Sequence, residues 1–233
     1  MTLSPDESTG GAPPATSSAA ATLPPPSTAA AASLLERADA LAAGPRPAEA
    51  LPLYRELLAV EPGHVDARVR LAQLLIQHDE LEPALTLLAE ALRNAPDQTE
   101  CLVLRGEILT RLRRYEEADA DLRRVLRLVP SHAPAHLELG RLLWRKGLVG
   151  EAAACFRRAL EFQPESARTC YYLGDALNQA GDLAGASAAL QRAIELDPRY
   201  AKAHHLLGRV FDRLGRPEDA RAMYERARDL AGW

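Results

Sequence analysis

The sequence predicts an all-α protein, a solenoid of six 34-residue helix-turn-helix repeats over residues 31–233, preceded by a disordered tail. Proline recurs at a fixed interval of 34 residues, and fixed periods of this size are typical of repeat architectures. The five prolines are Pro62, Pro96, Pro130, Pro164 and Pro198. Ala and Leu dominate a composition with only 5% aromatic residues, which favours helix over sheet.

The first 30 residues are expected to form a disordered tail outside the repeats. They are mostly Ala, Pro, Ser, Thr and Gly, so they have few large apolar side chains to offset the entropy cost of ordering. No basic residue precedes Arg37, and prolines interrupt every apolar run, which argues against a secretory signal or a membrane span. We therefore expect a cytoplasmic location, in keeping with three cysteines that show no paired spacing.

The repeats can be aligned without any insertion when the proline is set at position 32. The six units are then 31–64, 65–98, 99–132, 133–166, 167–200 and 201–233. Position 20 is alanine in every unit, position 8 is alanine or glycine, and position 11 is leucine or phenylalanine. Small residues at positions 8 and 20 would let two helices approach closely while larger neighbours interlock.

Each unit is expected to contain two helices. Positions 3, 4, 7, 8, 10 and 11 lie on one side of a helical wheel and predict the first helix. Glycine at position 15, present as Gly147, Gly181 and Gly215, suits the left-handed residue that ends a helix. A second helix begins near Pro47 in the first unit and Pro217 in the last, and the proline at position 32 ends it.

This pattern resembles the tetratricopeptide repeat (TPR) family, whose signature is W-x2-L-G-x2-Y…A-x3-F…P over 34 residues. Unit five matches it with Leu173, Gly174, Leu177, Ala186 and Pro198, although no unit has tryptophan at position 4. The resemblance implies a right-handed superhelix of antiparallel helix pairs. It also implies a scaffold that binds peptides or partner proteins, with the first helices lining a concave groove.

The face opposite the core side of each first helix, at positions 2, 5, 6, 9, 12 and 13, is therefore the candidate binding surface. Acidic residues outnumber basic ones there in units one to three, and basic residues outnumber acidic ones in units four to six. Arginine together with aromatic residues is typical of binding hot spots, although ordinary solvated helix faces also carry charge. The candidate ligand-binding residues are Arg141, Trp144, Arg145, Arg168, Tyr171, Tyr172, Asn178, Lys202, His205 and Arg209.

Two functions from different classes fit this pattern. The first is an adaptor whose groove holds a protein or peptide segment with acidic and apolar residues. The second is a structural subunit that assembles through the ends of the solenoid, including a homodimer through the C-terminal end, where Leu230 and Trp233 lie. Position 28 is Leu or Ile in the first five units but Arg228 in the sixth, as a water-facing last helix requires.

Other classes of function are not expected. The formal net charge of −4 argues against nucleic-acid or membrane-surface binding. No phosphate-binding loop, G-x-S-x-G, H-E-x-x-H or C-x-x-C motif occurs, so we expect neither an enzyme nor a cofactor. Pro134 separates His132 from His136, so this pair predicts no metal site. All basic residues except Lys146 and Lys202 are arginine, which is typical of a GC-rich bacterial genome.

Overall fold

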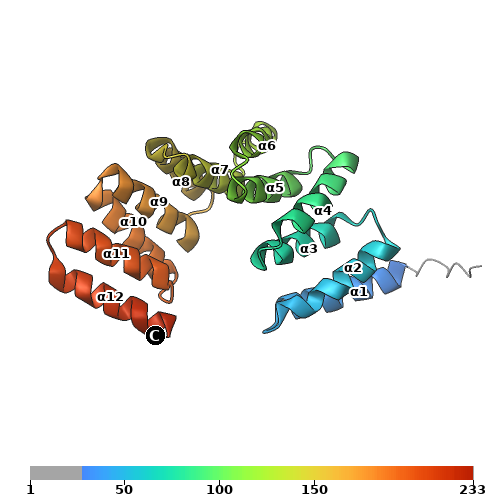
Figure 1. Ribbon diagram of the computed structural model, residues 1–233, viewed down its shortest axis with the longest axis horizontal. Helices are drawn as coiled ribbons and strands as arrows, with labels where there is room; N and C mark the ends of the chain where they lie inside the picture. The colour runs from blue at the N-terminus through green and yellow to red at the C-terminus, as the bar shows by residue number, and fades with distance from the viewer. Residues whose placement is uncertain (1–27, 233) are drawn as a thin grey trace, which may run out of the picture.

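The computed structural model describes residues 28–232, in which all regular structure is helical (Figure 1). The first helices of the successive pairs are α1 (Thr28–Ala42), α3 (Val65–Gln77), α5 (Thr99–Arg111), α7 (Ala133–Arg145), α9 (Ala167–Ala180) and α11 (Ala201–Arg213). The second helices are α2 (Ala50–Val60), which follows the 3₁₀-helix η1 (Pro47–Glu49), then α4 (Leu81–Asn94), α6 (Tyr115–Leu128), α8 (Val149–Phe162), α10 (Leu183–Leu196) and α12 (Pro217–Ala231). The predicted helical repeat solenoid is confirmed.

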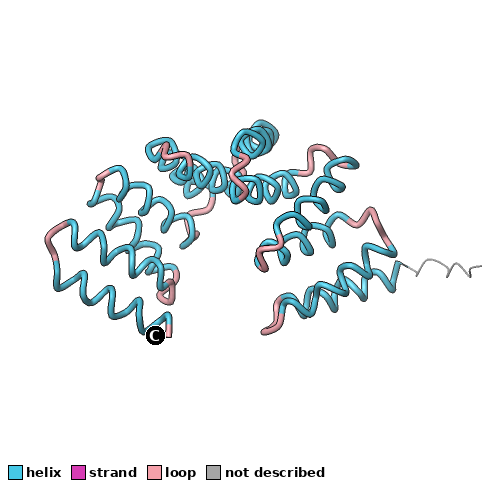
Figure 2. Tube along the Cα trace, viewed as in Figure 1, coloured by secondary structure: helices cyan, strands magenta, loops and turns pink. Residues whose placement is uncertain are grey.

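The helix pairs follow one another along an arch, with loops at both of its edges (Figures 1 and 2). Each first helix from α3 to α9 contacts its own second helix and also the first helix of the next repeat. In Figure 1, α5 lies on the inner side of the arch and α6 on the outer side. The odd-numbered helices therefore form the concave face on which a ligand would lie.

The start of the helical region differs slightly from the prediction. Helix α1 begins at Thr28, inside the segment assigned to the tail. The rest of that tail and Trp233 lie outside the described residues. Within residues 28–232, no helix is long and apolar enough to cross a membrane.

Position 8 sets how closely the two helices of a repeat approach. A Cβ added to Gly140 would lie 2.5 Å from Cε1 of Phe156, and one added to Gly174 would lie 2.6 Å from Cγ of Leu190. Phe156 and Leu190 are fully buried, so neither side chain has free space to move into. Glycine at position 8 is thus a packing requirement in these repeats, and it brings the ring of Phe156 against the backbone of α7.

Polar side chains at position 4 tie successive repeats together through the proline at position 32. Nε2 of His136 lies 2.9 Å from the carbonyl oxygen of Pro130, and Nε2 of His204 lies 3.1 Å from that of Pro198. In the second repeat Arg68 donates to the carbonyl of Pro62. These histidines have structural hydrogen bonds, and no cluster of potential metal ligands occurs within residues 28–232.

His132 caps the N-terminus of α7, because its Nδ1 accepts a hydrogen bond from the backbone N–H of Ala135 at 3.2 Å. Burial lowers the pKa of His132 below its ordinary value of 6.5. As the pH falls through 6.5, the unfolded chain takes up a proton that the folded state resists, so stability is expected to fall between pH 7 and pH 5. Thermal melts at both pH values should show a smaller loss for His132→Asn, which keeps an oxygen cap without titrating. Equal losses would contradict this role.

Candidate functional site

The concave face exposes fewer positions than the helical wheel predicts. In the first five repeats, positions 5 and 12 are buried or half-buried between neighbouring first helices, and Val69, Val103, Ile76 and Thr110 are among the buried ones. The wheel of an isolated helix takes no account of these neighbours, which cover it from both sides along the solenoid axis. Positions 2, 6, 9 and 13 therefore provide most of the surface that a ligand in the concave groove can reach.

Two of the ten candidate residues belong to a buried ion-pair network at the centre of the groove. Arg141 lies 2.5 Å from Glu138 and 3.0 Å from Glu107, and Arg168 lies 3.2 Å from Glu138 and 3.6 Å from Glu107. The Glu138 side chain is only 5% exposed. The two guanidinium groups and two carboxylates balance each other, so the candidates Arg141 and Arg168 are not free cations.

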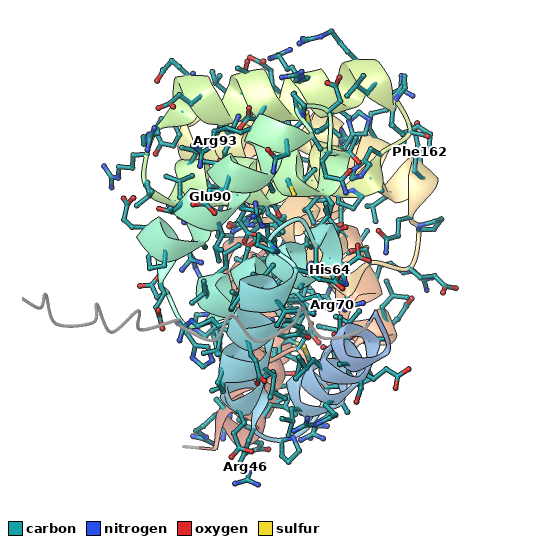
Figure 3. All side chains as sticks on the ribbon, turned by 90° about the vertical axis from the view of Figure 1, so that its right-hand side faces the viewer. Arg46, His64, Arg70, Glu90, Arg93 and Phe162 are labelled. Carbon is teal, nitrogen blue, oxygen red and sulfur yellow. The ribbon has the colours of Figure 1, made fainter. Side chains whose placement is uncertain are left out.

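The network links three repeats, since Glu107 lies on α5, Glu138 and Arg141 on α7, and Arg168 on α9. Burial raises the pKa of Glu138, while the nearby charge of Arg141 opposes that rise. Burial also disfavours the charged form of Arg141, but the nearby Glu138, Tyr172 and Glu107 together outweigh it and raise the pKa of Arg141. Several ion pairs of the outer helices, by contrast, lie within one helix, such as Glu90 with Arg93 on α4 (Figure 3).

An aromatic cluster adjoins this network. Tyr172 lies between the guanidinium groups of Arg141 and Arg168, 5.3 and 6.0 Å from its ring centroid. Its ring also meets Tyr171 at 5.4 Å, and Tyr171 meets Tyr200 at 5.2 Å. Burial raises the pKa of Tyr171 and raises that of Tyr200 to about 12, so both hydroxyls remain hydrogen-bond donors at neutral pH. The cluster therefore offers a ligand apolar rings with polar edges.

Two arginines in the C-terminal half of the groove carry unbalanced charge. Arg145, at position 13 of its repeat, and Arg209, at position 9, are exposed and form no ion pair among residues 28–232. Tyr171 and Asp175 both lie within the electrostatic influence of Arg209. These are the free cations that the C-terminal half of the groove presents.

The other candidates occupy different places. Asn178 is buried, at 3% exposure, and accepts hydrogen bonds from Arg213, so it is not available to a ligand as predicted. Trp144 is half-buried against the core, and its Nε1 is buried with no acceptor within the described chain. Lys202 and His205 line a hollow on the last repeat of the described residues, where position 5 is exposed instead of packed against a further first helix.

A second hollow, which the sequence analysis missed, lies on the concave face of the first two repeats. It has a volume of about 240 Å³, and Asp39, Tyr54, Arg70 and Gln73 line it. The Tyr54 hydroxyl donates to Asp39 at 2.5 Å, and Nε of Arg70 lies 3.1 Å from the same carboxylate. Asp39 and Arg70 occupy positions 9 and 6 of successive repeats, and no signal in the sequence shows that they meet.

Sequence comparison decides the family. Family models described as tetratricopeptide repeat match residues 40–108, 103–167 and 203–232, and one described as TPR repeat matches residues 174–215. The chain belongs to the tetratricopeptide repeat family. No curated protein matches this TPR chain in sequence.

Solved structures of other TPR proteins share its fold. A tetratricopeptide repeat protein from Parabacteroides merdae superposes with a TM-score of 0.73 at 21% identity, covering 88% of this chain and 80% of that one. MamA from Desulfovibrio magneticus gives 0.60 at 26% identity, over 78% of this chain and 94% of its own. YrrB, described as a TPR protein with an unusual peptide-binding site, gives 0.55 at 22% identity, over 76% and 91%. At these identities the likeness establishes the helical repeat fold.

Proposed function

We propose that this TPR protein is an adaptor that binds a peptide segment in the C-terminal half of its concave groove. The observation that carries the proposal is the presence of a half-buried tyrosine cluster, Tyr171 and Tyr172, and the free cations Arg145 and Arg209 in the same half of the groove. Aromatic and arginine side chains dominate binding hot spots because they combine large contact area with hydrogen bonding or charge. The peptide-binding site of YrrB, a protein of the same fold, supports this class of function.

The ligand chemistry follows from which charges remain unbalanced. Arg141 and Arg168 are neutralised by Glu138 and Glu107, so they hold the groove in shape and stack on Tyr172. Arg145 and Arg209 are the groups that an acidic side chain can approach without breaking an existing ion pair. We therefore expect a segment in which an acidic residue lies close to an aromatic or aliphatic residue, and we expect its affinity to fall with salt.

The test is a selection of random twelve-residue peptides on the immobilised protein, followed by affinity measurements on the selected peptides. The double variant Arg145→Glu/Arg209→Glu is expected to weaken binding more than tenfold, which corresponds to about 1.4 kcal/mol. Raising the salt concentration from about 50 to about 500 mM shortens the electrostatic screening length roughly threefold, and this should also weaken wild-type binding.

The matched control is Arg157→Glu/Arg226→Glu. Both arginines are exposed on the outer helices α8 and α12, and neither forms an ion pair within the described residues. This variant makes the same change in net charge, so it should leave affinity within about twofold of wild type if the placement of Arg145 and Arg209, and not the overall charge, determines binding. Equal losses in the two double variants, or no salt dependence, would show that the free cations of the groove do not hold the ligand.

A further inference from the structure

The last repeat, formed by α11 and α12, has two hollows on the face that points away from the preceding repeat. The first hollow, about 310 Å³, has a floor of Ala201, Ala227 and Ala231 and a rim of Lys202, His205 and Arg228. The second, about 580 Å³, adjoins it at Tyr224 and Arg228 and extends to Asp212. We call the surface that these two hollows form, with Lys202, His205 and Asp212 on α11 and Tyr224 and Arg228 on α12, the end face.

The same face of each preceding repeat is covered by the first helix of the next one. The covered faces are apolar at positions 5 and 28, where they carry Leu35, Val69, Val103, Leu137 and Tyr171, and Leu58, Leu92, Leu126, Leu160 and Ile194. On the end face these positions are His205 and Arg228, and both side chains are exposed. A helix bound there would meet an imidazole and a guanidinium group in place of the apolar side chains of an internal joint.

The two ends of the end face carry charges of opposite sign. Lys202, in the first turn of α11, and Arg228, in the last turn of α12, line the same hollow beside the N-terminal end of α11. Neither forms an ion pair within residues 28–232. At the other end, Asp212 of α11 lines the second hollow, and it accepts a hydrogen bond from the Tyr224 hydroxyl at 2.6 Å. Arg221 and Glu225 on α12 neutralise each other at 2.9 Å.

Between successive repeats inside the chain, the C-terminal end of a first helix contacts the preceding repeat. Arg111, the thirteenth residue of its repeat, donates to the carbonyl of Ile76 at position 12 of the preceding repeat, at 3.0 Å. Arg213 makes the equivalent contact with Asn178. Asp212 occupies position 12 of the last repeat, so the repeat geometry places it opposite the thirteenth residue of a helix seated on the end face.

We propose that the end face binds a helix of a partner protein that runs parallel to α11. This helix carries acidic side chains in its first two turns, opposite Lys202 and Arg228, and a basic side chain near its thirteenth residue, opposite Asp212. Such a charge order also suits the helix dipole, which favours acidic groups at the N-terminus and basic groups at the C-terminus. The end face is distinct from the groove, so this inference goes beyond the proposed function.

The first helix of a second copy does not have this charge order. Helix α1 has no acidic residue in its first turn and no basic residue in its last turn. Head-to-tail stacking of copies would therefore leave Lys202, Arg228 and Asp212 without partners. A symmetric pairing of two end faces would run antiparallel, and it serves as the competing outcome of the test.

Two peptides based on α5 provide the probes. Helix α5 covers the equivalent face of the second repeat, with Glu100 in its first turn and Arg111 at its end. In the forward probe, Arg105→Glu adds a second acidic residue at position 7 of the repeat. Between the first two repeats, Leu71 at position 7 lines the same hollow as Leu58 at position 28 of the preceding repeat. An acid at position 7 of the probe is therefore placed opposite Arg228, which is position 28 of the last repeat. The reversed probe has arginine at positions 100 and 105 and glutamate at position 111. Both carry a side-chain staple on the face turned away from the protein.

Fluorescence anisotropy on the full chain is expected to show at least tenfold tighter binding of the forward probe. The variant Lys202→Glu/Arg228→Glu should reverse this preference, and circular dichroism should show unchanged helix content because both residues are exposed. The groove variant Arg145→Glu/Arg209→Glu should leave the preference intact, which separates this inference from the proposed function. Absence of forward-probe binding up to millimolar concentration, equal binding of both probes, or sedimentation showing a dimer that Lys202→Glu/Arg228→Glu abolishes would overturn the proposal.

Discussion

Replacing Arg141 with methionine is expected to lower the free energy of unfolding by about 3–5 kcal/mol, because it leaves the buried carboxylate of Glu138 without its nearest counter-charge. The side chain of Arg141 is only 11% exposed, and that of Glu138 5%. Arg168 cannot take over fully, since it also faces Glu107 and lies nearly half-exposed. Urea denaturation followed by circular dichroism measures the loss.

The double variant Glu138→Met/Arg141→Met is the matched control for that experiment. Removing both charges of a buried pair and filling their volume with apolar side chains is often neutral for stability. We therefore expect the double variant to recover most of the loss of Arg141→Met. A double variant that is as unstable as the sum of two independent losses would show that Glu138 and Arg141 do not act as a pair.

Replacing Gly140 with alanine is expected to destabilise the protein by about 1–3 kcal/mol, as overpacking of a filled core does. The new Cβ would lie 2.5 Å from the ring of Phe156, which is fully buried between α7 and α8. Either the ring must leave its rotamer or the two helices must separate, and both changes reach the neighbouring Tyr172 stacked on Phe156 at 5.8 Å. Thermal unfolding of the variant measures the effect.

Gly150→Ala is the control for this substitution. Gly150 is an exposed residue of α8 with no atom within 4 Å of an added Cβ, so alanine there should raise stability by about 0.5–1 kcal/mol. Phe156→Leu should partly rescue Gly140→Ala, because the second repeat combines Ala72 with the buried Leu88 at the same two positions. If Gly140→Ala is as stable as wild type, close helix approach is not what glycine provides at position 8.

The fold could be predicted from the sequence because the same local residue pattern recurs in each repeat. The 34-residue spacing of proline, the alanine at position 20 and the glycines at position 15 each report a property of one helix pair. The positive φ angles of Gly147, Gly181 and Gly215, between 71° and 86°, match the predicted helix ends. Asp79 and Arg113 take the same left-handed conformation without being glycine, so the sequence could not indicate the turns in those two repeats.

The site was only partly accessible, because it depends on contacts between repeats. Arg141, Arg168 and Glu138 lie on a face that the helical wheel identifies correctly, but their mutual pairing spans up to 61 positions of sequence, from Glu107 to Arg168. Asn178 was misplaced for the same reason, since Arg213 of the following repeat covers it. Helix periodicity describes one helix at a time and therefore cannot distinguish a side chain that faces a ligand from one that faces the next repeat.

Photo-crosslinking tests the central claim, that the concave face in the C-terminal half binds the ligand. A selected peptide with a photoreactive residue beside its acidic side chain would be irradiated with the full chain and the crosslinked residues identified by mass spectrometry. Crosslinks on Arg145, Tyr171, Tyr172 and Arg209 are the predicted result, with none on the outer helices α8, α10 and α12. Crosslinks concentrated on the outer helices, or on the first two repeats around Asp39 and Arg70, would contradict the claim.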